Sequence, residues 1–231
     1  MKSGFIRKIY TDATIKKISV KIKQLGTTKW NAISFQNARI LTTIIAILIA
    51  LYSFDFGYIF GPLAGITWYY LFYYLFLESP VNKRGQKLNK EALDFFEILT
   101  LTLESGRNLE NSIEIAAANV DSELSSEFKR ALVEVKLGKS LMEALEDMKA
   151  RIPSETINNI ILNITQTEVF GNNILQTMYN QIEFLREKEV YEIKGQINKI
   201  PNKISIISVL FVLPLILLII LGPYLIQLLT K

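Results

Sequence analysis

The segment Gly138-Lys-Ser-Leu-Met-Glu-Ala-Leu145 decides the fold, because two related segments accompany it at nearly constant spacing. The first, Gly106-Arg-Asn-Leu-Glu-Asn-Ser-Ile113, begins 32 residues earlier, and Gly171-Asn-Asn-Ile-Leu-Gln-Thr-Met178 begins 33 residues later. In each copy a glycine is followed by a polar capping residue two positions on. Glycine readily takes the left-handed conformation that ends a helix, and Asn or Ser at an N-cap begins the next one. The repeat therefore predicts three tight turns between paired helices.

The residues of these turns have matching predicted roles. The glycines end one helix and the polar residues cap the next: Gly106 with Asn108, Gly138 with Ser140, and Gly171 with Asn173. In the second copy Glu143 stands three residues after Ser140, which is the spacing of a capping box, and Gln176 follows Asn173 at the same distance. We expect all six turn residues to be structural.

Between the turns, apolar residues recur with helical spacing, as at 157, 160, 161 and 164. Helices are predicted near 89–105, 108–118, 122–137, 140–150, 154–170 and 173–200. The fold class is therefore all-α, with a six-helix cytoplasmic bundle made of three helical hairpins. The last helix leads toward a further apolar segment, so it could carry a push or twist from this domain into a membrane.

Two apolar stretches flank the bundle. Residues 40–77 contain Asp55 as their only charge, and 38 residues are too many for one span, since about 20 residues cross a bilayer. A split at residues 55–57 predicts a transmembrane hairpin, its first arm extended by a snorkelling Arg39. Residues 204–229 supply a third transmembrane helix. Near the hairpin tip Gly57 and Gly61 form a small-xxx-small pair, which either lets helices approach or simply makes the turn.

Charge predicts the orientation of these spans. Residues 1–39 carry nine Lys or Arg against the single acid Asp12, and positive segments beside membrane spans remain in the cytoplasm. The sequence thus predicts a multi-pass protein of the cytoplasmic (inner) membrane, with its amino terminus and main domain in the cytoplasm. Its parts are an amphipathic arm (1–39), the membrane hairpin (40–77), the cytoplasmic domain (78–203) and the third span (204–229).

The basic arm has an apolar stripe at Ile15, Ile18, Ile22 and Leu25. Two interpretations stay open. The arm is either a helix lying on an anionic lipid surface, or a flexible cationic tail that only sets the topology.

The composition of the chain argues against an enzyme and against a metal site. The chain has no cysteine and no histidine, which removes thiolate nucleophiles and the commonest metal ligand and proton shuttle. Asp55 is the only carboxylate within the apolar stretch 40–77, and no phosphate-binding Gly-x-x-x-x-Gly-Lys-Ser/Thr motif occurs. Residues 78–203 hold sixteen basic and twenty acidic residues, so nucleic-acid binding is not expected. We predict no enzyme activity, no cofactor and no metal site.

Two glutamates near the predicted turns are candidate partner contacts. Glu168 lies three residues before Gly171, at a helix end where the helix dipole disfavours a carboxylate, and Glu104 lies two residues before Gly106. Each either contacts a partner protein or forms a hydrogen bond that fixes the following helix, and the second role is the commoner one for such groups.

The helical hairpins with their Gly-x-Asn/Ser turns, the stretch Glu168-Val-Phe-Gly171 and the closing apolar segment with Leu213-Pro214 resemble the type II secretion system F family. The resemblance covers residues 88–223. In layout the chain is similar to half-size platform proteins of tight-adherence (Flp) pilus machines, with one F domain where full-size members carry two.

This resemblance implies a platform protein of a type IV pilus-like or type II secretion machine, which couples a cytoplasmic secretion ATPase to the extraction and assembly of pilin subunits. It also implies a second copy of the domain, supplied by a homodimer or by a similar platform protein, and contact with membrane lipids. The alternative is a membrane-tethered helical scaffold that recruits an unrelated cytoplasmic partner.

Overall fold

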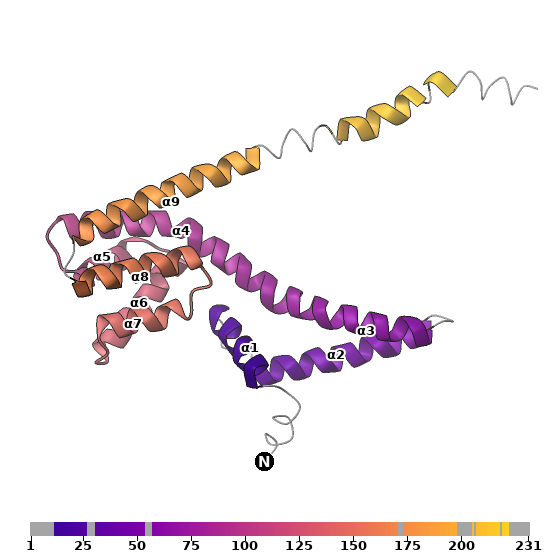
Figure 1. Ribbon diagram of the computed structural model, residues 1–231, viewed down its shortest axis with the longest axis horizontal. Helices are drawn as coiled ribbons and strands as arrows, with labels where there is room; N and C mark the ends of the chain where they lie inside the picture. The colour runs from indigo at the N-terminus through magenta and orange to yellow at the C-terminus, as the bar shows by residue number, and fades with distance from the viewer. Residues whose placement is uncertain are drawn as a thin grey trace, which may run out of the picture. The chain divides into compact units, whose positions relative to one another are not determined.

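The structure is a computed structural model, in which the chain forms two compact units, Met1–Ile182 and Glu183–Lys231 (Figure 1). It describes residues 12–26, 31–53, 57–170, 173–197, 205, 207–217 and 219–221. Every regular element in these ranges is a helix, which confirms the all-α prediction for the part of the chain that is described.

Helices α2 (Ala32–Ser53) and α3 (Gly57–Tyr73) pack against each other along their length (Figure 1). Their close approach depends on Gly61 and Gly65, because a Cβ on Gly65 would lie 2.6 Å from the Ile47 side chain and one on Gly61 would lie 3.2 Å from Leu51. Gly61 therefore lies within α3, packed against α2, and makes no turn. The alternative in which Gly57 and Gly61 simply form the turn is thus wrong for Gly61. Gly65, which the expected pair of Gly57 and Gly61 does not include, is the second small residue that lets α3 approach α2.

No linker separates this hairpin from the following domain. Helix α3 continues through a π-helical turn, η2 (Tyr74–Glu78), into α4 (Ser79–Glu104). Pro80 explains the π turn, because proline lacks an amide hydrogen and its ring clashes with the carbonyl four residues before it in a regular α-helix. The helix expected to begin near 89 thus starts ten residues earlier, and the predicted boundary at 77 and 78 falls inside a continuous helix.

Helix α1 (Asp12–Gln24) packs on the chain itself, which corrects both sequence interpretations of the arm. Ile18 and Ile22 are only 2% and 8% exposed, and they form a cluster with Phe35 of α2, Phe72 of α3 and Leu77 of η2. The apolar stripe is therefore neither turned to lipid nor part of a flexible tail. Burial at the base of the hairpin is available because α2 and α3 each present a phenylalanine there and η2 presents Leu77.

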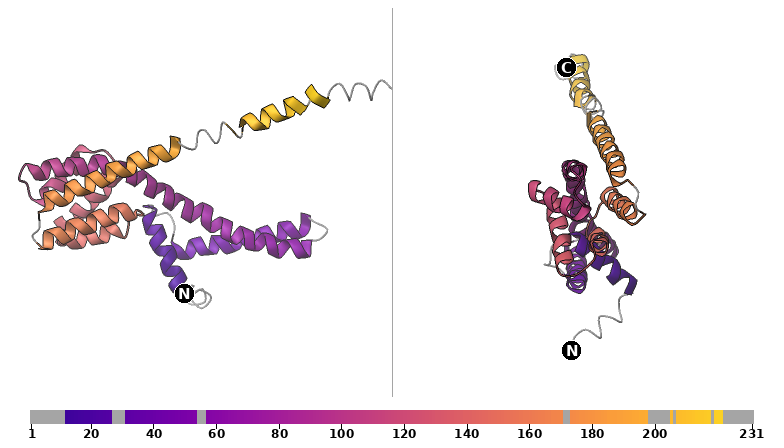
Figure 2. Two further views of the ribbon diagram at one scale, coloured as in Figure 1. Left: turned by 45° about the horizontal axis from the view of Figure 1, so that its top comes forward. Right: turned by 90° about the vertical axis from the view of Figure 1, so that its left-hand side faces the viewer.

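The other helices are α5 (Leu109–Asn119), α6 (Glu123–Lys136), α7 (Leu141–Lys149), α8 (Glu155–Phe170) and α9 (Ile174–Ile197). Helices α5, α6 and α8 contact α4, while α7 packs on α6 and α8; two further views show this group of helices (Figure 2). In the core, the Phe95 ring stacks on Phe128 of α6 at 4.3 Å, and Phe96 meets the same ring edge-on at 6.2 Å. Burying a side chain of this size contributes about 1.5–3 kcal/mol, so α4 and α6 form the centre of the domain.

One helix among the described residues, Ala32–Ser53, is long and apolar enough to cross a membrane. Helix α3 has 17 residues, and the apolar helix Ile207–Leu221 is also shorter than a full span. Three spans thus stay a prediction. The proposed external turn at Asp55 lies outside the described residues.

Candidate functional site

Two of the three glycine turns are visible in full. Gly106 and Gly138 have φ angles of +81° and +102°, values that L side chains rarely adopt. After α6 the amide of Lys139 donates to the Glu134 carbonyl at 3.2 Å, and that of Gly138 donates to Val135 at 2.8 Å. This pair of bonds is a Schellman motif, which satisfies carbonyls that the helix end leaves free. Gly171 lies outside the described residues.

The polar residue of each turn caps the helix that follows. Asn108 accepts from the Asn111 amide at 2.9 Å. Ser140 and Glu143 form both bonds of a capping box. Asn173 accepts from the amides of Leu175 and Gln176 at 3.1 and 3.4 Å. The third box is incomplete, however, because the Gln176 side chain donates to Asn180 at 3.2 Å, one turn further along α9.

The two candidate contact residues have different surroundings. The Glu104 carboxylate accepts a hydrogen bond from the Tyr179 hydroxyl, which raises the pKa of Tyr179 and ties α4 to the first part of α9. Glu168 is exposed, and no side chain in the described part of the chain bonds to it. Glu104 thus bonds to α9 and not to the helix that follows its turn, whereas Glu168 is exposed; a partner contact stays a prediction for both residues.

A buried arginine that sequence reasoning missed joins three parts of the first unit. The Arg84 guanidinium on α4 donates to Glu123 at 2.6 Å and to Glu127 at 2.7 Å, both on α6. It also donates to the Gln24 carbonyl at the end of α1, at 2.6 Å. A cation at this position suits the negative end of the α1 dipole. Replacing Arg84 alone would leave the buried Glu127 carboxylate with Arg151 as its remaining cation and would remove the donor to the Gln24 carbonyl, so it should destabilise the first unit.

From Glu127 the ion pairs continue toward the Gly138 turn. Arg151, in the loop between α7 and α8, donates to Glu127 at 3.0 Å and to Glu134 at 3.0 Å. Lys139 then bridges Glu134 at 2.7 Å and Asp147 of α7 at 2.6 Å. The network thus links the predicted turn residues to the end of α1.

Neighbouring cations lower the pKa of two carboxylates in this network, Glu134 and Glu123. The hydrogen bond from Lys139 is the main cause that lowers the pKa of Glu134. For Glu123, burial opposes ionisation, but the hydrogen bonds from Arg84 and Lys87 outweigh it and lower the pKa. Paired in this way, these groups hold helices together and do not have the raised pKa expected of a general acid.

The positions of Arg84 and Glu127 in the helical repeat could have revealed their ion pair from the sequence. Arg84 stands four residues before Leu88 and Glu127 four before Ala131, so each charge lies on the buried face of its helix. A charged residue in an apolar stripe predicts a buried partner. At the hairpin base, Arg39 follows the same rule: it stacks on the Tyr69 ring at 3.4 Å and donates to the Tyr69 carbonyl, so it packs inside the hairpin and does not snorkel.

The sequence model of the type II secretion system (T2SS) protein F family matches residues 95–222, more than half of the chain. No match was found among curated proteins or among solved structures. Members of the family are inner-membrane components that work with secretion machinery, and helix Ala32–Ser53 could span a membrane. On the strength of this match, the chain belongs to the type II secretion system protein F family.

Proposed function

We propose that the chain is a half-size platform protein of a tight-adherence type pilus machine, which couples a cytoplasmic secretion ATPase to the extraction of pilin subunits from the cytoplasmic membrane. It acts without catalysis of its own. Its domain binds the motor on the cytoplasmic side, and its helices transmit the motion of the motor to the membrane.

The observation that carries this proposal is the unbroken helical path from Gly57 to Glu104 through α3, η2 and α4. Its first part packs on the apolar hairpin, and its last part carries the aromatic core of the domain. A continuous hydrogen-bonded path of this kind can carry force between the hairpin and the domain, with the π turn η2 as the point that resists bending least. The sequence had suggested the last helix for this role, while the structure offers a second route through α3, η2 and α4, which precede the rest of the domain in the sequence.

Pairing of two chains is part of the proposal. The family match covers one domain, and full-size relatives are expected to hold two, so a homodimer or a similar platform protein supplies the other. The Gly61 and Gly65 face is already filled by α2 within the chain. Pairing is therefore expected to use the cytoplasmic helices, where apolar residues such as Leu101 and Leu137 are exposed.

The test measures the ATP hydrolysis rate of a secretion ATPase from the same organism, with the full-length protein in lipid nanodiscs. We expect the wild-type chain to bind the ATPase and to raise its rate. Glu168→Gln should reduce this effect without changing the melting temperature, because the exposed carboxylate bonds to no side chain in the described residues.

Glu146→Gln is the matched control, since Glu146 on α7 is also exposed and, among the described residues, pairs with Lys149 in the adjacent turn. It should behave like the wild type. Absence of binding between the ATPase and the wild-type chain would disprove the proposed function. Equal rates for wild type and Glu168→Gln would remove Glu168 from the contact and leave the platform role intact.

A further inference from the structure

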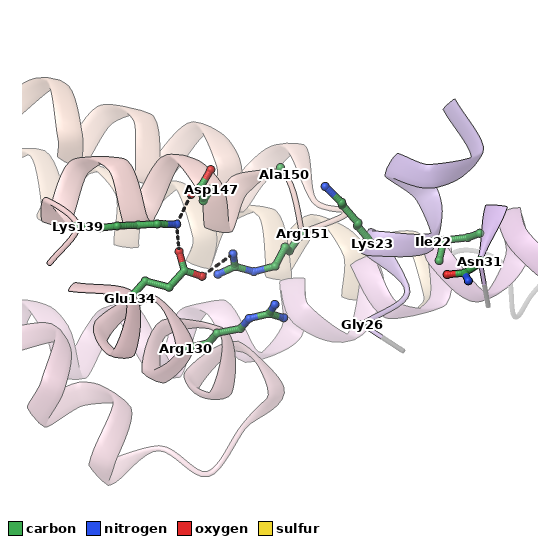
Figure 3. Close-up of a pocket in the computed structure, with 10 residues that line it drawn as sticks. All are labelled: Ile22, Lys23, Gly26, Asn31, Arg130, Glu134, Lys139, Asp147, Ala150 and Arg151. Carbon is green, nitrogen blue, oxygen red and sulfur yellow. Dashed lines mark hydrogen bonds and ion pairs between the residues drawn. The ribbon is translucent and has the colours of Figure 1, made fainter. Parts of the chain in front are cut away.

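A pocket of about 470 Å³ lies between the end of α1 and the helices α6 and α7 (Figure 3). Lys23 and Gly26 line it on the arm side, and Asn31 lines it just before α2 begins. The opposite wall is formed by charged residues of the network and its surroundings: Arg130, Glu134, Lys139, Asp147 and Arg151. The pocket is distinct from the candidate contacts Glu104 and Glu168, which do not line it.

The lining carries more positive than negative charge. Its cations are Lys23, Arg130, Lys139 and Arg151, and its carboxylates are Glu134 and Asp147. Figure 3 shows Lys139 between the two carboxylates, at 2.7 Å from Glu134 and 2.6 Å from Asp147. Both carboxylates are thus already neutralised within the wall. Two positive charges remain in excess, and such a pocket attracts anions.

Several donors of the wall lack acceptors. Lys23 and Arg130 have no ion pair within the described residues, although the charge of Lys23 reaches Asp147 and helps, after the hydrogen bond from Lys139 and the charge of Arg151, to lower its pKa. The Nη2 atom of Arg151 is buried and has no acceptor in the described part of the chain. Lys23 and Arg130 therefore remain available to an anion, beside a guanidinium whose donors the described residues do not fully use.

We propose that this pocket binds a phosphate-bearing anion. Arginine and lysine together recognise phosphate oxygens, and the volume is within the range of small-molecule sites. Such a ligand would connect Lys23 of α1 to Arg130 of α6, and so fasten the arm to the domain in addition to Arg84.

Two sources could supply this chemistry. Because Asn31 directly precedes the membrane-span candidate α2, the headgroup of an anionic lipid is one. A soluble phosphate compound from the cytoplasm is the other. The proposal goes beyond the platform role and does not involve the ATPase, so the two can fail independently.

The experiment uses the full-length protein with two probes. Native mass spectrometry measures the retention of phosphatidylglycerol against phosphatidylcholine, and calorimetry in phosphatidylcholine nanodiscs measures the binding of inorganic pyrophosphate. The test variant is Lys23→Gln with Arg130→Gln. Its matched control is Lys17→Gln with Lys129→Gln, which removes two exposed charges from the same two helices but outside the pocket.

We expect at least one probe to bind the wild type, and the test variant to weaken that binding about tenfold, whereas the control does not. Selective retention of phosphatidylglycerol alone identifies a lipid headgroup as the source. Pyrophosphate binding identifies a soluble source. Binding of neither probe, or equal weakening by test and control variants, would overturn the proposal.

Discussion

At the scale of single residues, two glycines cannot be replaced by larger residues without a cost in stability, and the physical reasons differ. Gly138 stands in open space, so its requirement is only the positive φ angle. Gly85 has an ordinary helical backbone within α4, but the Pro153 carbonyl oxygen lies 2.2 Å from the place where its Cβ would be. An added Cβ would meet a main-chain atom, which cannot move aside as the end of a flexible side chain could.

We expect Gly85→Ala to lower the free energy of unfolding by about 1–3 kcal/mol, since the added methyl forces α4 away from the loop before α8. Gly195→Ala is the control, because nothing lies within 4 Å of its Cβ position and alanine favours a helix more than glycine. Thermal melting of the purified protein compares the two. Equal melting of Gly85→Ala and wild type would contradict the close approach.

Acid should weaken the first unit through Glu134. Its folded pKa is lowered below 4.5, chiefly by the hydrogen bond from Lys139, so the ion pairs contribute fully above that pH. Their contribution falls as the pH drops below 4.5 toward the folded pKa, because the unfolded chain binds the proton more readily. Between pH 7 and pH 3, the melting temperature of Glu134→Gln should therefore decline less steeply than that of the wild type. Parallel profiles would show that Glu134 is not held ionised.

At the scale of elements, α1 depends on the helices around it. It has 13 residues, which is short for an isolated helix in water, so its burial against α2, α3 and η2 stabilises it. Arg84 holds its carboxyl end. The π turn η2 places Leu77 in the same cluster, so the turn before Pro80 also forms part of the surface on which α1 packs.

Ile18→Asp with Ile22→Asp should release α1, since two buried apolar side chains become charged. Trypsin would then cleave the full-length protein faster after Lys16, Lys17, Lys21 and Lys23. Val20→Asp is the control, because Val20 is 42% exposed on the other face. The digestion is done in detergent without anionic lipid. If the wild-type arm is cut there as fast as the double variant, α1 is not packed on the protein.

At the scale of the whole molecule, the continuous helical path from Gly57 to Glu104 links the hairpin and the domain. The matched family region begins at residue 95, within the core half of α4. The hairpin, the arm and the first half of α4 therefore lie before it. Yet Arg84 and Gly85, also outside that region, make some of the tightest contacts with α6 and the loop before α8.

The proposed topology predicts opposite labelling of two cysteine variants in the cysteine-free chain. Asp55→Cys should react with an impermeant thiol reagent on intact cells, because the hairpin tip is expected outside. Lys129→Cys, on the exposed face of α6, should react only after lysis. Labelling of Lys129→Cys in intact cells would place the domain outside and exclude contact with a cytoplasmic motor.

The sequence by itself determined what depends on local chemistry. Left-handed glycines, N-caps and helical periodicity act within a few residues, so the Gly106 and Gly138 turns and the bounds of α5 to α8 could be predicted closely. The resemblance to the family rested on the same pattern, and the match over residues 95–222 shows the family. Glu104 and Glu168 look alike in sequence, and only the structure separates them, because Tyr179 comes from a helix 75 residues away.

Only the tertiary structure decided where the amphipathic arm packs, which charges are buried and which glycines touch a neighbour. Each of these depends on a partner distant in sequence: Gln24 for Arg84, Pro153 for Gly85 and Ile47 for Gly65. An apolar stripe looks the same whether lipid or protein covers it, since the hydrophobic effect has no direction. The choice between these two environments is made by the packing of the whole first unit.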